Sequence, residues 1–308
     1  MTRLVTFEGL RQAWARLWRP SLLIAALMIV LSPRTGALGV VVVALGALLW
    51  RLAITPRTRE LGRYIAGFAL FAMLRNLADD VTKATHYGYV IDWERALFGA
   101  VPTVVLQGSL LGRWSALDLG VVAVYLSYFL IPPTVVVVLW MLWPDRLRPY
   151  VTSTLVMFGV SVVVHVLLPT APPWLAAARG YLPPVHQVVR LVFGEYAPAT
   201  YDYGQGLSGN AVAAMPSVHL AVTALIACAL WRTPLRTVSL LYSAAMLFTV
   251  VYGGEHYVVD GLAGVTLACV SWWLASRRVR PGYRDDPLHA EHPATTRPGH
   301  TSTLRVGR

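Results

Sequence analysis

Charged residues are scarce in this sequence. Only 13% of its 308 residues are Asp, Glu, Lys or Arg, whereas 56% are hydrophobic and the mean hydropathy is +0.56. Soluble globular domains usually carry about 25% charged residues. The composition therefore excludes an ordinary soluble domain of this length and predicts an integral membrane protein, with the lipid bilayer as its surroundings.

Cysteine is almost absent as well. The two cysteines, Cys228 and Cys269, lie within apolar runs and form no Cys-x-x-Cys motif or Cys/His cluster. We interpret both as buried packing residues and not as a disulfide or a metal site. The sequence also has no His-Glu-x-x-His motif, and we predict no metal site.

Long apolar runs are what the sequence does contain. Two short runs fill 20–50, and six largely uncharged runs follow at 64–81, 119–144, 150–168, 214–231, 237–254 and 256–276. A helix needs roughly 20 apolar residues to cross the hydrocarbon core of a bilayer. The runs predict an all-α, polytopic transmembrane helix bundle, with a six-span core preceded by an N-terminal apolar hairpin.

The predicted division of the chain follows from the same pattern. A basic amphipathic segment occupies 1–19, the apolar hairpin 20–50, the six-span domain 51–276 and a disordered tail 277–308. The tail is rich in Pro, Thr, His and Arg and has no apolar periodicity.

Basic residues indicate the orientation. The segments that face one side in an eight-span arrangement hold 19 of the 26 Lys and Arg residues; they are 1–19, 51–63, 144–148, 232–236 and 277–308. Cytoplasmic loops are enriched in Lys and Arg. We therefore predict a multi-pass protein of the cell membrane with both termini cytoplasmic. The net charge of +11 then reflects topology, and nucleic acid is excluded as a partner.

Three ionisable sites lie inside the apolar runs: Arg75 with two acidic neighbours, His219, and His256 with Asp260. Such groups are costly at membrane depth and usually face a protein interior or a water-filled cavity. In the predicted orientation all three lie toward the outer ends of their spans. They are compatible with a single site that opens to the extracytoplasmic face.

Two histidine motifs lie 37 positions apart. His256 and Asp260 are spaced to share one face of a helix, where the carboxylate can orient the imidazole. Pro216 is expected in the first turn of another helix, with Ser217 and His219 near its unpaired N–H groups, which favour an anion such as phosphate. Together they supply the groups needed for phosphoryl transfer through a phosphohistidine.

Other interpretations stay open at this point. A histidine in a span is often a hydrogen-bonded packing residue, and we interpret His165 in this way. Two histidines and an aspartate can also bind zinc. A transporter or lipid translocator would use buried His, Arg and Asp as a substrate or proton path, although it predicts charges through both halves of the membrane.

The sequence resembles the type 2 phosphatidic acid phosphatase superfamily over about 64–276. The resemblance lies in Pro-Ser-x-His at 216–219 followed by His-x-x-x-Asp at 256–260. The stretches "PTAPPW" (169–174) and "AAMPSVH" (213–219) are most similar to the inositolphosphoryl-transferase branch, which includes the inositol phosphorylceramide synthases.

The resemblance implies a role for each matching residue and makes the six-span region the catalytic domain. His256 would attack phosphorus, Asp260 would orient it, and His219 would act as general acid and then base. Ser217 and nearby N–H groups would bind phosphate oxygens, with no metal or other cofactor. The substrate would be a phospholipid or polyprenyl phosphate, and the reaction transfer of phosphoinositol or a similar head group. The alternative is a phosphatase that releases inorganic phosphate.

The sequence departs from the family pattern in its cations. Thr249 and Val250 occupy positions where the superfamily usually has Ser-Arg, so another cation must bind the phosphate. Arg75 is the first candidate, although an ion pair with Asp79 would also explain it. The further candidates for binding substrate are Arg179, Arg190, Lys83 and Tyr257.

The segment 169–213 is predicted to be a long outer loop. Its aromatic residues suit either a lid or acceptor site, or anchoring at the membrane interface.

Overall fold

The computed structural model describes residues 56–81, 85–196 and 212–278. In this part of the chain the secondary structure consists of helices, with isolated bridges and no strands. This confirms the predicted all-α class. The predictions for the N-terminal segment, the apolar hairpin, Lys83 and nearly all of the tail lie outside the described residues.

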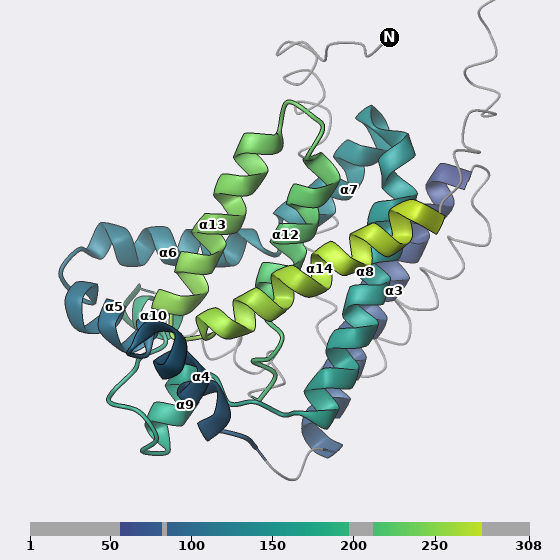
Figure 1. The fold of residues 1–308 in the computed structure, drawn as a ribbon. Helices are drawn as coiled ribbons and strands as arrows, with labels where there is room; N and C mark the ends of the chain where they lie inside the picture. Colours follow the sequence, from purple (N-terminus) through teal and green to yellow (C-terminus); the bar gives the residue numbers. More distant parts are fainter. Residues whose placement is uncertain (1–55, 82–84, 197–211, 279–308) are drawn as a thin grey trace, which may run out of the picture.

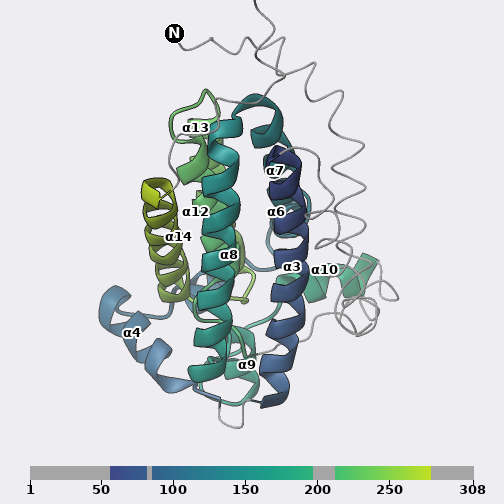
Figure 2. The same cartoon turned by 90° about the vertical axis from the view of Figure 1, so that its right-hand side faces the viewer.

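The core of the fold is a bundle around α12 (Val218–Leu230). It packs against α8 (Pro144–Leu167), α13 (Arg236–Tyr252) and α14 (Val258–Arg278), and α3 (Pro56–Val81) packs on the far side of α8. Figure 2 shows α14, α8 and α3 in a row, and Figure 1 shows that α14 crosses α8 obliquely. Nearly every residue of α12 is buried, which its uninterrupted apolar sequence allows.

The run predicted as one span at 119–144 forms two helices instead. These are α6 (Ser115–Ser127) and α7 (Ile131–Leu142), with a bend of 50° between them. Pro132 and Pro133 lie at the start of α7 and have no N–H to donate to the preceding turn. The helical hydrogen bonding of α6 therefore ends there, and the chain changes direction.

Two helices among the described residues, α8 and α14, are long and apolar enough to cross a membrane. The bent pair of α6 and α7 makes a third candidate span. Helices α12 and α13 are apolar but have only 13 and 17 residues. At about 1.5 Å per residue, α12 is about 20 Å long, which is shorter than the hydrocarbon core.

Three of the basic segments that were predicted to face the cytoplasm meet at one end of the bundle. Arg146, at the start of α8, donates a hydrogen bond of 2.6 Å to the carbonyl of Ala229, near the end of α12. Arg148 lies 3.8 Å from Glu60 of α3. The connection between α12 and α13 lies at the same end, at the top of Figure 1.

Short helices gather at the opposite end. They are α4 (Gly88–Phe98), α5 (Pro102–Leu110), α9 (Pro173–Ala178) and α10 (Val188–Tyr196), which Figure 1 shows around the lower ends of α13 and α14. The predicted outer loop therefore contains two helices, and its residues 197–211 lie outside the described part.

The "PTAPPW" stretch is held between two other segments. Thr170 forms parallel bridges with His86 on one side and with Ala213 on the other. Its carbonyl accepts a hydrogen bond of 3.2 Å from the N–H of Ala214. This pairing fixes the backbone that leads into α12.

The two cysteines are close to each other. Their sulfur atoms are 3.9 Å apart, one from α12 and one from α14. Cys269 is exposed and Cys228 is partly exposed, so the prediction that both are buried packing residues is wrong. Each faces away from the core on an apolar helix surface, where hydropathy alone does not distinguish a lipid-facing position from a buried one.

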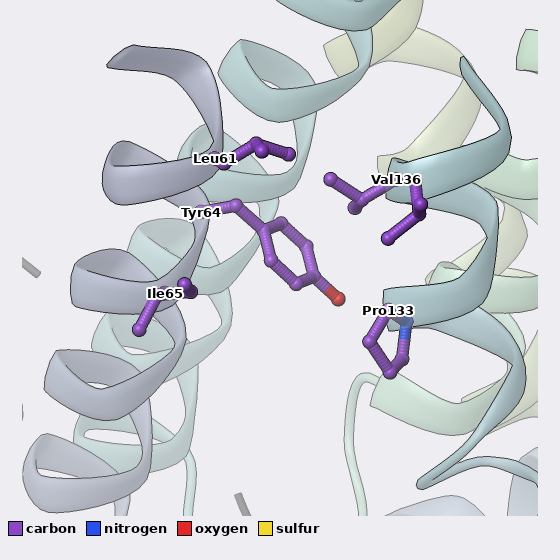
Figure 3. Close-up of a pocket in the computed structure, with 6 residues that line it drawn as sticks. Leu61, Tyr64, Ile65, Pro133 and Val136 are labelled. Carbon is purple, nitrogen blue, oxygen red and sulfur yellow. The ribbon is translucent and has the colours of Figure 1, made fainter. Parts of the chain in front are cut away.

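A small apolar pocket lies between α3 and α7. Figure 3 shows the Tyr64 side chain extending from α3 toward Pro133 of α7. The other lining residues are Leu61, Ile65, Val136 and Val137. None of the residues predicted for the functional site lines this pocket.

The backbones of helices α12 and α14 approach each other closely at Gly264. A Cβ atom at this position would lie 2.3 Å from the Ser217 carbonyl oxygen and 3.2 Å from the Ala221 nitrogen. Both are backbone atoms and cannot rotate away. The absence of a side chain at Gly264 therefore permits the contact between the two helix starts.

We expect Gly264→Ala to lower the free energy of unfolding by about 2 kcal/mol, because the added methyl group separates α12 from α14. The measurement is thermal unfolding in detergent. Gly159→Ala is the matched control, since no atom lies within 4 Å of a Cβ built at that position of α8. Equal unfolding temperatures for the two variants would contradict the close approach.

Candidate active site

Two histidines from separate parts of the chain face each other. Nδ1 of His219, in the first turn of α12, lies 3.1 Å from Nε2 of His256. His256 lies in the turn between α13 and α14, two residues before α14 begins, so the prediction that it lies on the helix is wrong. The turn still brings the two predicted histidines into direct contact.

A backbone carbonyl determines which nitrogen of His256 carries the proton. Nδ1 of His256 lies 3.0 Å from the carbonyl oxygen of Ala214. A carbonyl oxygen only accepts hydrogen bonds, so the neutral ring carries its proton on Nδ1. Nε2 then has a free lone pair, and Nδ1 of His219 donates a hydrogen to it. The pair therefore consists of a nucleophilic nitrogen and a proton donor.

Asp260 lies beside the same histidine and is fully buried. One of its carboxylate oxygens is 3.6 Å from Nδ1 of His256 and accepts a hydrogen bond of 2.9 Å from the N–H of Tyr257. Its backbone carbonyl accepts a hydrogen bond of 3.0 Å from the N–H of Ser217. Asp260 thus connects the start of α14 to the start of α12 and places negative charge next to His256.

Ser217 is the N-cap of α12. Its hydroxyl accepts a hydrogen bond from the N–H of Leu220 at 3.4 Å, and the residue is completely buried. The helix begins at Val218, so the prediction that Pro216 occupies the first turn is wrong by two residues. The capping position suits serine, whose hydroxyl satisfies an N–H that the helix cannot.

Two tyrosines cover His219. The ring centroids of Tyr125 and Tyr128 lie 5.0 and 4.6 Å from the centroid of its imidazole. Both come from the end of α6 and the turn that follows, where the bend toward α7 begins. The bend therefore brings aromatic surface over His219, which restricts the ring and limits the access of water.

Arg75 of α3 lies near this cluster. Its guanidinium is close enough to His219, His165 and Glu255 to interact electrostatically with each of them. The side chain of Asp79 lies outside what the structure describes, and the alternative of an ion pair between the two stays open. Among the candidate cations, Arg75 is the one that these electrostatic contacts connect to the histidine pair.

The other candidates for binding substrate lie elsewhere. Arg179 and Arg190 are exposed, the first at the end of α9 and the second on α10. The ring of Tyr257 is fully buried and packs with Val90, Leu182 and other apolar residues below the turn.

His165 belongs to the neighbourhood of the site, which its sequence context did not indicate. It is 1% exposed, and its Nε2 lies 3.4 Å from the carbonyl oxygen of Pro216, just before α12. Its Nδ1 has no hydrogen-bond partner among the described residues. The contact agrees with a structural role in holding the segment that leads to His219.

Sequence reasoning missed Glu255, which directly precedes His256. Burial raises the pKa of Glu255 to about 6, and the nearby His256, a hydrogen bond from Gln187 and the charge of Arg75 partly oppose this shift. The amide of Gln187 lies 3.3 Å from its carboxylate. Its position in "GGEHY", beside a candidate nucleophile, was the only available signal.

Gln107 of α5 was also missed, because a single glutamine in a largely apolar stretch carries no motif. Its amide nitrogen donates to the carbonyls of His186 and Tyr252 at 2.8 and 2.7 Å, and its amide oxygen accepts the N–H of His186 at 2.9 Å. Gln107 thus joins the segment before α10 to the end of α13. These contacts support the turn that carries His256.

Among the described residues, no group of three or more His, Cys, Asp or Glu side chains is arranged to hold a metal ion. The chemistry that this cluster can perform with its own side chains is nucleophilic attack by one imidazole and proton transfer by the other.

Comparisons with known proteins agree with the motifs. The sequence model of the PAP2 superfamily matches residues 88–274. The chain is 24% identical over 235 residues to phosphoinositol dihydroceramide synthase of Bacteroides thetaiotaomicron, an alignment that covers 70% of this chain and 76% of that protein. No solved structure gives a significant match.

We expect Gln107→Leu to destabilise the protein by about 2 kcal/mol or more, because it leaves buried carbonyl and N–H groups without their hydrogen bonds. Thermal unfolding and limited proteolysis of 179–190 measure the effect. Gln187→Leu is the matched control, since this side chain makes one hydrogen bond of 3.3 Å. If both variants unfold alike and the segment keeps its protease resistance, Gln107 does not hold the loop.

Proposed function

The chain belongs to the PAP2 superfamily, whose model covers more than half of its length, and we propose that it is a membrane phosphotransferase that acts on lipid phosphate esters. The observation that carries the proposal is the contact between Nδ1 of His219 and Nε2 of His256. The other nitrogen of His256, Nδ1, is hydrogen-bonded to the carbonyl oxygen of Ala214. The named relative supports phosphoinositol or a similar head group as the group transferred.

In the first step, the lone pair on Nε2 of His256 attacks phosphorus of the donor lipid. A nitrogen–phosphorus bond forms, and the bond between phosphorus and the oxygen of the lipid alcohol breaks. His219, which carries a proton on both ring nitrogens once the anionic phosphate is bound, gives the proton on its Nδ1 to that leaving oxygen and becomes a neutral imidazole. The substrate phosphate occupies the space between the two rings, so it replaces their direct contact.

In the second step, a hydroxyl acceptor attacks the same phosphorus. His219, now without its proton, removes the hydrogen from the hydroxyl as the new phosphorus–oxygen bond forms. The nitrogen–phosphorus bond breaks, and the electron pair returns to Nε2 of His256. Asp260 stabilises the positive charge that His256 carries while it is bonded to phosphorus.

We assign Arg75 to the phosphate oxygens, in place of the arginine that this chain lacks at Val250. Its electrostatic contacts with His219 and Glu255 support this role. The N-terminus of α12, capped by Ser217, adds the positive end of a helix dipole. Both sources of positive charge act where negative charge develops on the phosphate.

We place the site on the extracytoplasmic face of a six-span domain. The basic segments gather at one end of the bundle, and the turn between α13 and α14 that contains His256 lies toward the other end (Figure 1), which supports the predicted orientation. A lipid donor then keeps its tail in the bilayer while its phosphate reaches the histidines.

The assay that tests this function supplies the purified protein with phosphatidylinositol labelled in its head group and with ceramide or diacylglycerol as acceptor. We expect a new labelled lipid, a phosphodiester. Inorganic phosphate released from phosphatidate would instead support the phosphatase alternative. If neither product forms with any lipid phosphate ester, the proposed function is wrong.

We expect His256→Ala and His219→Ala each to lower kcat/KM by at least about a thousandfold, because each removes a group that the reaction needs. His86→Ala is the matched control, since the His86 side chain is exposed and lies outside the cluster. Full activity in either of the first two variants would refute the assigned mechanism.

We expect Arg75→Gln to lower kcat/KM by about a hundredfold, the size of effect seen when one charge-stabilising donor is lost. Arg75→Lys should retain more activity than Arg75→Gln, because lysine keeps the positive charge but lacks the planar guanidinium that can bind phosphate through two N–H groups. Arg113→Gln, at an exposed position ahead of α6, is the control. Equal rates for Arg75→Gln and the control would remove Arg75 from the phosphate site.

A further inference from the structure

A buried carboxyl group lies beneath the candidate active site. Glu94 belongs to the face of α4 that also carries Val90 and Ile91, and it is fully buried. This face packs on the start of α14. A glutamate in a cluster that is otherwise apolar is costly to bury, so its contacts require an explanation.

One oxygen of Glu94 caps α14. Its Oε1 accepts a hydrogen bond of 3.0 Å from the N–H of Val259, in the first turn of the helix. The N–H groups of the first turn have no partner within the helix, and a carboxylate there also interacts favourably with the helix dipole. Glu94 therefore fixes the backbone that carries Asp260 and follows His256.

The second oxygen of Glu94 has no hydrogen-bond partner in the part of the chain that the structure describes. Three buried polar atoms in this region make no hydrogen bond with the described residues: Oε2 of Glu94, Oδ1 of Asp260 and the hydroxyl of Tyr257. The three groups interact electrostatically. Two carboxylates that interact with each other in a buried region cannot both ionise without a large cost, so a proton on one of them relieves the repulsion.

The surroundings favour Glu94 as the carrier of that proton. Burial and, to a smaller extent, the charge of Asp260 raise the pKa of Glu94 to about 7, although the N–H groups of Val259 and Val258 partly oppose the shift. The titratable groups that interact with Glu94 are Asp260, in the first turn of α14, and Tyr257, just before it; Tyr89 on α4 interacts with both of these groups. The two charged residues beside it on α4, Asp92 and Arg95, are exposed and pair with each other at 3.9 Å.

We propose that Glu94 is a positioning residue for the reaction: it holds the first turn of α14 and, by carrying or losing a proton, sets the charge beside the Asp260–His256 pair. Ionised Glu94 adds a second negative charge, which stabilises the positive charge that His256 gains on bonding to phosphorus. Protonated Glu94 keeps the cap but removes this charge. The inference rests on the proposed function for its effect on the rate, although the proton on Glu94 exists independently of it.

The first test compares the pH dependence of kcat in the full-length protein and in E94Q. Glutamine keeps an oxygen for the Val259 N–H but stays neutral at every pH. We expect the ratio of wild-type kcat to E94Q kcat to be near one below about pH 6 and to rise to roughly tenfold above about pH 8. KM should be equal in both, because Glu94 is buried and does not reach the substrate. A ratio that does not change with pH would overturn the proposal.

Glu94→Leu separates the cap from the charge. This variant loses the acceptor for the Val259 N–H, so we expect its Tm to fall by several degrees, whereas that of E94Q stays close to wild type. If E94Q and Glu94→Leu unfold at the same reduced temperature, the oxygen does not cap α14, and the positioning role is wrong.

A second measurement needs no activity. The infrared difference spectrum of the substrate-free protein between about pH 6 and about pH 8 should show a protonated carboxyl band that disappears as the pH rises. The comparison is made in Glu255→Gln, which removes the other carboxyl whose pKa burial raises into this range: the band should be present in Glu255→Gln and absent in the double variant Glu94→Gln/Glu255→Gln. Loss of the band in Glu255→Gln, or its persistence in the double variant, would overturn the proposal even if no substrate had been found. An inactive wild-type protein with the expected band would contradict the proposed function alone.

Discussion

The hydrogen bond between the Ala214 carbonyl and Nδ1 of His256 is the contact on which the proposed chemistry depends. At 3.0 Å it places the ring proton on Nδ1 and leaves the lone pair on Nε2, which points at His219. Without it the imidazole can rotate or change its tautomer, and the nucleophilic nitrogen no longer faces the proton donor. The carboxylate of Asp260 lies 3.6 Å from Nδ1 of His256 and places a negative charge beside the ring, whose orientation the Ala214 carbonyl already determines.

The rest of the fold holds the segments that make this contact. Ala214 is fixed because its N–H donates to Thr170, and the helices that carry His219 and Asp260 meet where Gly264 has no side chain. The backbone bond from Ser217 to Asp260 joins the two helix starts directly. Each of these contacts lies at the end of the bundle away from the basic segments. The geometry of the site therefore does not require α12 and α13 to be as long as a full membrane span.

The sequence allowed the helical class, the two histidine motifs and the family to be predicted, and the family match confirms the resemblance that those motifs carried. The bend before α7 was also predictable from the sequence, because Pro132 and Pro133 interrupt helical hydrogen bonding, although the uniform hydropathy of the run concealed it. The hydrogen-bond partners that come from distant parts of the chain were not predictable. The Ala214 carbonyl, Glu94 and Gln107 lie 42, 165 and 145 positions from the groups they hold. A carbonyl, a lone glutamate and a lone glutamine form no pattern from which such distant contacts can be derived.

The central claim is that the transferred group is bonded to His256 during the reaction. The most direct measurement is rapid quenching of the protein with head-group-labelled phosphatidylinositol in the absence of acceptor, followed by analysis of the peptide that contains His256. The account predicts an acid-labile label on that histidine, which is lost when an acceptor is added and is absent in the protein without the His256 imidazole. Labelled product that forms at the normal rate while His256 never carries label would contradict it, because the acceptor would then attack the donor lipid directly.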